Sequence, residues 1–397
     1  MNAVQSLRNY AVITGGYWAF TLTDGAIRML VVLYFHQLGY TPLAIASLFL
    51  FYEFFGIITN LVGGWLGARF GLNTTMHAGM VLQVIALLML TVPTEYLTII
   101  YVMAAQALSG IAKDLNKMSA KASVKLFVPS DSESENKLFK WIAVLTGSKN
   151  TLKGVGFFLG GLLLALYGFQ GALYCLAGGL FAVLLLTLFL LPSDLGKTKR
   201  TAKFSQLFAN KPAINWLSAA RFFLFGARDV WFVVALPVYL TATLGWQHEQ
   251  IGSFFALWII GYGFVQALAP KILQGHHPSG HTAQWLAWLL MLLPAGIAWA
   301  LYKDFDPATV VIIGLSLFAV VFAINSAVHS YLIVEWSDHD KVAMNVGFYY
   351  MANAGGRLTG TVLSGLLFQY YGLAGCLIAS SVFIASAAGL SYKLPRH

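Results

Sequence analysis

Three lysines, Lys113, Lys117 and Lys121, recur at intervals of four residues within a segment apolar enough to cross a lipid bilayer. Successive members of this series lie about 40° apart around a helix, so all three side chains share one face. Like charges at this spacing repel, and a cation in hydrocarbon costs roughly 3 kcal/mol or more on insertion scales. The series therefore predicts a face turned toward water and an anionic ligand. The alternative for Lys121 is that its side chain snorkels to the headgroups.

Basic residues outnumber acidic ones within the apolar segments. Nine of the 24 Lys and Arg residues lie there: Arg28, Lys113, Lys117, Lys121, Lys149, Lys153, Arg221, Arg228 and Arg357. Four acids accompany them: Asp24, Glu53, Asp114 and Asp229. Even if every acid pairs with a base, five cations still need a partner, which an anionic substrate supplies. Arginine grips oxyanions through two parallel bonds and lysine acts as a point charge, so we predict that these nine bind an oxyanion.

The four acids have two interpretations. Any of them could carry a proton during transport if desolvation favours its neutral form, and a structural ion pair is the alternative. Asp24 and Arg28, four residues apart, would pair on one helix. Asp229 is adjacent to Arg228 and so is expected to find its partner on another segment, with Arg357 as one candidate.

The composition is that of an integral membrane protein. Hydrophobic residues make up 58% of the 397, charged residues only 10%, and the mean hydropathy is +0.73. The first apolar stretch, about 10–35, is too long for a signal-peptide core and should remain as a span. Apolar segments predict an all-α protein of twelve membrane helices, starting near Tyr10, Pro42, Thr75, Tyr96, Leu138, Gly171, Ala213, Ile251, Thr282, Ala308, Ala343 and Ala374.

Charge predicts the orientation. With the N-terminus in the cytoplasm, fourteen basic residues fall in inside loops and tails, and only Lys303 falls outside. Both termini are therefore expected in the cytoplasm. The net charge of +9 is explained by this asymmetry and needs no nucleic-acid partner.

The chain contains two related halves. Leu38-Gly39-Tyr40 with 45–48 recurs 206 positions later in 244–254, and Tyr167-Gly168 with 169–171 recurs 204 positions later in 371–375. On the second offset Lys153 falls on Arg357, which predicts that the two face each other across a central cavity and bridge a substrate charged at both ends. We expect six-helix bundles at 1–192 and 213–397, joined by a cytoplasmic linker at 193–212. Such parallel repeats are typical of major facilitator transporters.

Two glycine-rich motifs resemble those of that superfamily. The segment 64–71, Gly-Trp-Leu-Gly-Ala-Arg-Phe-Gly, resembles its loop motif, although Ala68 stands where an aspartate is usual. Gly154, Gly156, Gly160 and Gly161 resemble the glycine motif of its antiporter branch without the proline. Close helix packing explains the same glycines equally well.

Three longer sequence segments make the resemblance more specific. The segments 17–25 (YWAFTLTDG), 109–121 (SGIAKDLNKMSAK) and 225–237 (FGARDVWFVVALP) resemble the ArsJ family of organoarsenical efflux permeases. The resemblance implies a bacterial inner-membrane exporter of 1-arseno-3-phosphoglycerate, which confers arsenate resistance. It also implies a functional link to a glyceraldehyde-3-phosphate dehydrogenase, which forms that molecule when it accepts arsenate. The residues alone lead only to an organic oxyanion.

Other functions fit less well. No nucleotide loop or nucleophile motif appears, so we expect neither an enzyme nor a cofactor. Cys175 and Cys376 lie in different halves, and His276, His277 and His281 fall in a turn rather than a metal site. The remaining rival is an organophosphate-for-phosphate or other organic-anion antiporter, which the same cations would serve. A sensor that does not transport, or a membrane enzyme, is a third possibility, but neither would require the repeat and its cations.

Overall fold

The computed structural model describes residues 3–40, 44, 47–127, 134–192, 211–246, 248–273, 277–338 and 341–396, and every regular element within them is helical. The predicted helix start near Pro42, the linker up to residue 210 and His276 lie outside the described residues. Pro212, which the sequence places in the linker, already begins a helix. The all-α prediction is confirmed.

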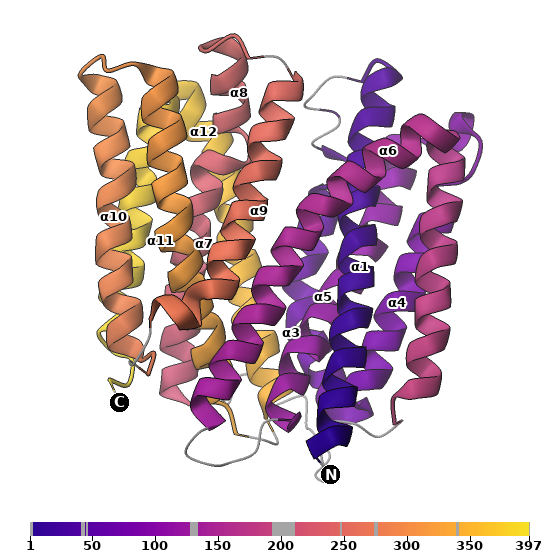
Figure 1. The fold of residues 1–397 in the computed structure, drawn as a ribbon. Helices are drawn as coiled ribbons and strands as arrows, with labels where there is room; N and C mark the ends of the chain where they lie inside the picture. The colour runs from indigo at the N-terminus through magenta and orange to yellow at the C-terminus, as the bar shows by residue number, and fades with distance from the viewer. Residues whose placement is uncertain are drawn as a thin grey trace. The chain divides into compact units, whose positions relative to one another are not determined.

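The described residues of the first half of the chain form five α-helices and one short 3₁₀ turn. They are α1 (Ala3–Gln37), α3 (Leu50–Phe70), α4 (Leu72–Met89), η1 (Thr94–Tyr96), α5 (Ile99–Phe127) and α6 (Ser134–Leu190) (Figure 1). Gly71 separates α3 from α4 with a φ of 99°, a backbone conformation that glycine adopts without strain. The helix α5 packs against α1, α3 and α4.

The second half repeats this pattern. It contains α7 (Pro212–Phe232), α8 (Ala235–Ala242), α9 (His248–Ile272), α10 (Gly280–Tyr302), α11 (Pro307–Glu335) and α12 (Val342–Ser391). Proline at the first turn and an Asp306 side chain that accepts from the Thr309 amide fix the start of α11. The helix α11 packs against α9, α10 and α7.

The longest helices, α6 and α12, each change direction at a glycine. Gly168 has a φ of 68° and Gly372 a φ of 61°, so each element consists of two helices joined at that residue. The two glycines lie in the words that repeat 204 positions apart, and the repeat is therefore present in the backbone as well as in the sequence.

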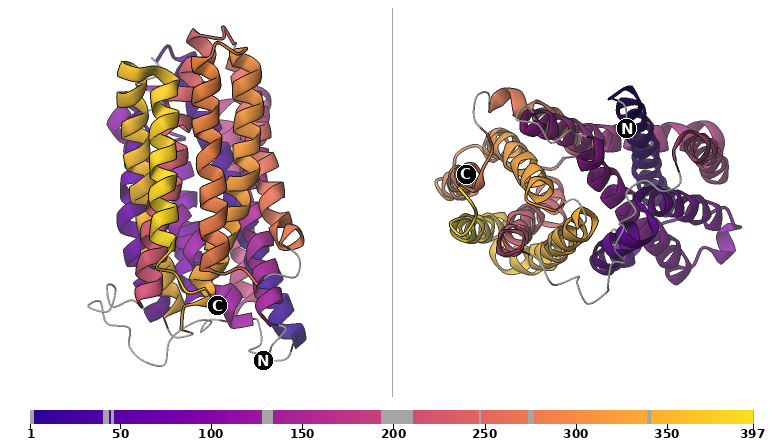
Figure 2. Two further views of the ribbon diagram at one scale, coloured as in Figure 1. Left: turned by 90° about the vertical axis from the view of Figure 1, so that its left-hand side faces the viewer. Right: turned by 90° about the horizontal axis from the view of Figure 1, so that it is seen from below.

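The chain divides into two compact units. Unit 1 comprises Met1–Ser134, Ser148–Ala209 and Ser337–Met351, and unit 2 comprises Glu135–Gly147, Asn210–Trp336 and Ala352–His397. Each has its own apolar core, built around Leu30, Phe35 and Leu173 in unit 1 and around Trp231, Phe318 and Phe322 in unit 2. Within each unit the helices form a bundle, seen from below in Figure 2. The bundle boundaries drawn from the sequence stay a prediction.

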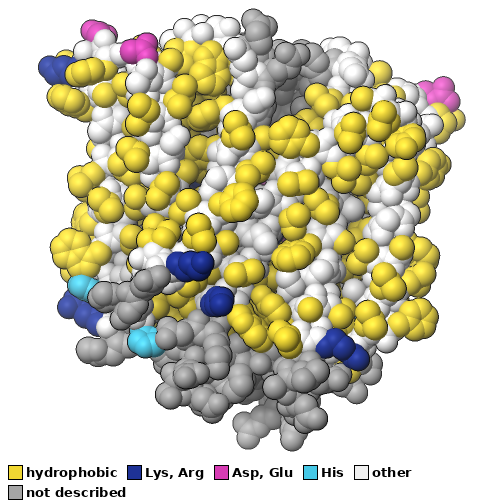
Figure 3. Space-filling model, in the orientation of Figure 1, with side chains coloured by type: hydrophobic (Ala, Val, Ile, Leu, Met, Phe, Trp, Pro, Cys, Tyr) yellow, Lys and Arg dark blue, Asp and Glu magenta, His cyan; other side chains and the backbone are white. Residues whose placement is uncertain are grey.

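The outer surfaces are those of membrane helices. Eight described helical segments are long and apolar enough to span a bilayer, and α6 and α12 among them each hold two helices. Large apolar side chains such as Leu162, Phe189, Leu257 and Leu292 are more than half exposed. Hydrophobic side chains cover most of the face drawn in Figure 3. Exposed apolar area of this extent is normal only where lipid covers it.

Candidate functional site

The nine basic residues singled out from the sequence all avoid full exposure. Lys121 and Arg221 are buried. The other seven are partly buried: Arg28, Lys113, Lys117, Lys149, Lys153, Arg228 and Arg357. The most exposed positions of the same helices carry large apolar side chains, such as Phe158 and Leu162 on α6, so these cations are more shielded than the outer surface of their helices.

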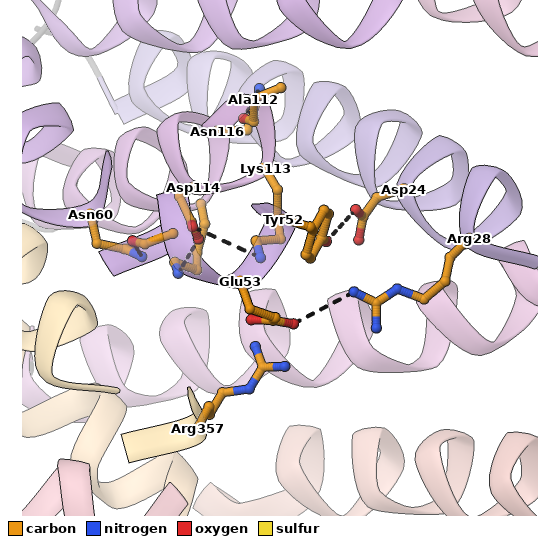
Figure 4. Close-up of polar contacts among 12 residues, drawn as sticks. Asp24, Arg28, Tyr52, Glu53, Asn60, Ala112, Lys113, Asp114, Asn116 and Arg357 are labelled. Atoms are coloured by element: carbon orange, nitrogen blue, oxygen red, sulfur yellow. Dashed lines mark hydrogen bonds and ion pairs between the residues drawn. The ribbon is translucent and has the colours of Figure 1, made fainter. Parts of the chain in front are cut away.

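Two lysines of α5 flank one carboxylate, and Figure 4 shows Lys113 beside Asp114. Asp114 lies between Lys117, whose Nζ is 2.6 Å from Oδ1, and Lys113, whose Nζ is 3.8 Å from Oδ2. The carboxylate is buried, while both lysines keep 12–15% of their side chains exposed. Asp114 therefore offsets part of the repulsion along the series and leaves an excess of positive charge on this face.

Two tyrosines complete the lysine face. The Nζ of Lys113 lies 3.8 Å from the ring centroid of Tyr52, and that of Lys117 lies 4.1 Å from the ring of Tyr350. Lys121 Nζ donates to the Tyr350 hydroxyl at 2.8 Å, so Lys121 points inward and does not snorkel. Ring faces attract cations without carrying an opposite net charge, so the tyrosines add no negative charge to this face.

Glycines allow α3 to approach α5 closely at this place. A Cβ on Gly110 would come within 2.5 Å of the Tyr52 carbonyl oxygen, and one on Gly56 within 2.9 Å of the Asp114 carboxylate. Without side chains at these two positions, Tyr52 and Asp114 can lie beside the lysines.

A second ion pair joins α1 to α6 in unit 1. Lys153 Nζ lies 3.0 Å from Asp24 Oδ2, and the Tyr52 hydroxyl donates to Asp24 Oδ1 at 2.6 Å. Arg28 instead pairs with Glu53 at 3.6 Å and lies over the Tyr52 ring at 4.6 Å. The expected Asp24–Arg28 pair is therefore wrong: Asp24 faces the neighbouring helix, where a lysine meets it.

Unit 2 contains the counterpart of this pair. Asp229 is fully buried and accepts from Arg357 Nε at 3.0 Å through Oδ2. It also accepts from Arg228 through Oδ1, at 2.6 Å from Nε and 2.5 Å from a terminal nitrogen. The expectation that adjacent residues cannot pair is wrong here, because the long arginine side chain folds back along the helix. The Arg357 pairing named as an alternative is present.

The two ion pairs occupy matching places. A Cβ on Gly156 would meet the Leu22 carbonyl at 2.6 Å, and a Cβ on Gly360, 204 positions later, would meet the Gly226 carbonyl at 2.5 Å. Leu22 and Gly226 are also 204 positions apart. The glycines on α6 and α12 thus let the first and fifth spans of each half touch, as the close-packing interpretation of this motif predicts.

The position of the carboxylate in the sequence differs by one residue between the two halves. On the offset of 204, Asp24 corresponds to Arg228, and Gly25 corresponds to Asp229. Unit 1 therefore holds one acid with one lysine at this place, whereas unit 2 holds one acid with two arginines and keeps a net positive charge.

Arg221 belongs to a different set of contacts in unit 2. Its Nε donates to Asn353 Oδ1 at 2.9 Å, a terminal nitrogen donates to Ser326 Oγ at 3.1 Å, and the guanidinium lies 3.7 Å from the Phe225 ring centroid. Lys149 lies partly buried on α6, one turn before Lys153.

All four acids of the spans take part in ion pairs with the predicted cations. The structure thus agrees with the ion-pair interpretation for each, and a role in proton coupling stays a prediction. Among the described residues, no group of three or more His, Cys, Asp or Glu could hold a metal ion. His281 accepts a hydrogen bond from Trp285.

Sequence reasoning missed Tyr52, Tyr350 and Asn353. All three are buried, and each touches a cation of a helix distant in sequence. In the sequence, Tyr52 directly precedes the intramembrane acid Glu53. This neighbour was the only feature that could have marked Tyr52 as a candidate site residue.

Comparison with known proteins agrees with this architecture. The family model described as Major Facilitator Superfamily matches residues 13–328, well over half of the chain. No curated protein matches the sequence.

Solved structures share the fold at low sequence identity. The human organic anion transporter MFSD10 (TETRAN) has a TM-score of 0.77 at 15% identity, covering 97% of this chain and 99% of that chain. A bacterial homologue of the iron transporter ferroportin, in an outward-facing state, has a TM-score of 0.76 at 12% identity, covering 97% of this chain and 98% of that chain. The proton:xylose symporter XylE has a TM-score of 0.73 at 15% identity, covering 99% of this chain and 96% of that chain. Identities this low show the fold alone.

Proposed function

Because the chain belongs to the Major Facilitator Superfamily, we propose that it is an efflux permease that exports the organoarsenical 1-arseno-3-phosphoglycerate by alternating access and so confers arsenate resistance. The superfamily and the fold make it a multi-pass membrane transporter rather than an enzyme. The observation that carries the proposal is the surplus of buried or partly buried cations, nine against four acids, within the membrane segments.

The arrangement of the cations supports a multiply charged oxyanion. Lys113, Lys117 and Lys121 share one carboxylate and two tyrosine rings, so the face that they form remains positive. In unit 2, Asp229 is opposed by two arginines, again with positive charge to spare. Each unit therefore holds excess positive charge, to which we expect a phosphate or arsenate group to bind more favourably than to water.

The choice of arsenic rests on the resemblance to the ArsJ family. The residues of its three words lie in α1, α5 and the α7–α8 region, and they include Asp24, the lysines of α5, and Arg228 with Asp229. These are the same side chains that form the ion pairs and the lysine face. The substrate has a phosphate at one end and an arsenate at the other, which suits two separate cationic places.

The partner and the location follow from the same proposal. A glyceraldehyde-3-phosphate dehydrogenase would supply the substrate inside a bacterial cell, and the permease would lie in the inner membrane with both termini in the cytoplasm. The fourteen-to-one distribution of basic residues in the loops supports this orientation.

Arsenate resistance in a sensitive bacterial strain tests the proposal. We expect resistance when the permease is expressed together with the dehydrogenase, and none when either is expressed alone. Lys303→Ala, which changes a basic residue outside the spans, is the matched control for the substitutions discussed below. Resistance that needs no dehydrogenase would contradict the proposed substrate.

The rival function is an exchange of organophosphate for phosphate, which the same cations would also serve. Counterflow of labelled phosphate into proteoliposomes loaded with phosphate separates the two. We expect no counterflow from the permease. Rapid phosphate exchange that competes with phosphorylated sugars would favour the antiporter.

A further inference from the structure

The buried face of α11 in unit 2 carries polar side chains that the cation pairs do not use. Asn325, Ser326, His329 and Ser330 lie within two turns of the helix, and each is at most 1% exposed. Asn325 and His329 are four residues apart and therefore share a face, as do Ser326 and Ser330. An apolar helix in a membrane would normally place aliphatic residues at such positions.

A charged group and further polar side chains from neighbouring helices meet this face. Arg221 of α7 donates to Ser326 Oγ at 3.1 Å. Gln266 of α9 donates to the same Ser326 hydroxyl at 3.2 Å. We call Arg221, Gln266, Asn325, Ser326, His329 and Ser330 the α11 polar cluster.

Within the part of the chain that the structure describes, four side-chain atoms of the cluster have no hydrogen-bond partner. They are Nδ2 and Oδ1 of Asn325, Nδ1 of His329 and Oγ of Ser330. An unsatisfied buried polar atom is destabilising, so folded proteins rarely keep several of them together unless they serve a function. Donors and acceptors are mixed in this group, which suits hydroxyl and ester oxygens as well as a charged oxygen.

The internal repeat gives the cluster its counterpart in unit 1. The helices α5 and α11 are both 29 residues long, and they begin and end 208 positions apart. On that register Asn325 corresponds to Lys117, and His329 corresponds to Lys121. Two of the three lysine positions are thus occupied by an asparagine and a histidine in the other half, while Lys113 corresponds to Val321.

We propose that the α11 polar cluster binds the hydroxylated carbon chain of a phosphorylated carboxylic acid, with Arg221 holding an adjacent anionic oxygen. This inference rests on the proposed function, since it names side chains of unit 2 that would recognise the hydroxyl group of that substrate class. It makes Asn325 and His329 specificity-determining residues: they favour an organic anion with a hydroxyl group over one without it.

Binding to the full-length protein in lipid nanodiscs tests the inference with two stable probes. The first is 3-phosphoglycerate. The second is 3-phosphopropionate, here the phosphate ester of 3-hydroxypropionate, which differs from the first only by lacking the hydroxyl group on C2. We expect the wild-type protein to bind the first about tenfold more tightly, the value of one well-made hydrogen bond in a buried polar site. Asn325→Leu and His329→Leu should abolish this preference while the affinity for 3-phosphopropionate changes little.

Three further variants make the result specific. Arg221→Gln should weaken the binding of both probes to the same extent, because it removes a positive charge and leaves the recognition of the hydroxyl group intact. Ser316→Ala changes an exposed hydroxyl of the same helix and should leave both affinities unchanged. Asn325→Leu should also unfold at the same or a higher temperature than wild type, since it removes unsatisfied buried atoms.

The outcomes separate the inference from the proposed function. If wild-type protein binds neither probe, the proposed substrate class is wrong and the inference falls with it. If wild type binds 3-phosphoglycerate but the ratio between the probes is unchanged in both Leu variants, only the inference is overturned. A large loss of thermal stability in Asn325→Leu would likewise overturn it, because the side chain would then be satisfied within the fold.

Discussion

At the scale of single residues, the buried acids differ in how much positive charge surrounds them. Asp24 has one lysine and a tyrosine hydroxyl, whereas Asp229 has two arginines. A buried carboxylate that loses its only cation keeps an uncompensated charge, but one that retains a second cation does not. The two matching ion pairs should therefore respond differently to the same kind of substitution.

Lys153→Ala is expected to destabilise the protein by at most about 3 kcal/mol, because Asp24 then loses its only direct ion pair and keeps the Tyr52 hydrogen bond and the more distant charges of Lys113 and Arg28. Arg357→Ala should cost less, since Arg228 still faces Asp229. The double variant Asp24→Asn/Lys153→Met should recover the stability lost in Lys153→Ala without recovering transport. Thermal unfolding in detergent, combined with resistance assays, measures both. Equal destabilisation by Lys153→Ala and Arg357→Ala would show that the second arginine gives no compensation.

Lys117→Ala or Lys113→Ala is expected to abolish arsenate resistance without loss of membrane expression. Their ammonium groups lie on tyrosine rings and act as point charges, so Lys→Arg should be milder than Lys→Ala. Growth on arsenate and immunoblots of membranes provide the measurement, with Lys303→Ala as the control. Full resistance in a well-expressed variant would remove that lysine from the site.

At the scale of elements, glycines determine which helices can touch. Gly156 and Gly360 bring α1 to α6 and α7 to α12 within backbone contact, and the ion pairs lie directly beside these contacts. The geometry of the ion pairs thus depends on positions that carry no side chain.

Gly156→Ala should destabilise the protein by about 1–3 kcal/mol, because its methyl group would meet the Leu22 carbonyl at 2.6 Å. Gly161→Ala is the matched control on the same helix, since its nearest neighbour lies at 3.9 Å. The control should gain the better helix propensity of alanine without the clash. Thermal unfolding followed by tryptophan fluorescence compares them, and equal melting temperatures would mean that the backbones do not meet there.

Part of this arrangement was predictable from the sequence. Helix starts were predicted near Gly171 and Ala374, and α6 and α12 change direction close by, at Gly168 and Gly372. The burial of the cations followed from their positions in apolar segments. Spacing along one helix could not reveal that Asp24 turns to Lys153, 129 residues away, or that Tyr52 and Tyr350 lie beneath the lysines. Those contacts depend on which helices pack together, and the Arg228–Asp229 contact depends on a side-chain rotamer.

At the scale of the whole molecule, the two halves share one backbone plan but present different chemistry. Unit 1 carries the lysine series on α5, and unit 2 carries arginines and the neutral groups of α11. A substrate with unlike ends suits such a pair of halves, whereas two identical halves would suit a symmetric ion. The bridging of both halves by one substrate, with Lys153 and Arg357 on opposite walls, stays a prediction. Both side chains already pair within their own units, so a substrate must compete with Asp24 and Asp229 for them.

Uptake of radiolabelled arsenic by inside-out membrane vesicles tests the central claim most directly. The medium would contain arsenate, glyceraldehyde-3-phosphate, NAD and the purified dehydrogenase, so that the organoarsenical forms at the cytoplasmic face. We predict uptake by vesicles that hold the wild-type permease and at least a tenfold loss with Lys113→Ala or Lys117→Ala, with none in any vesicle when the dehydrogenase is omitted. Uptake that persists without the dehydrogenase, or that is unchanged in both lysine variants, would contradict the claim that these cations bind an organic acyl arsenate during transport.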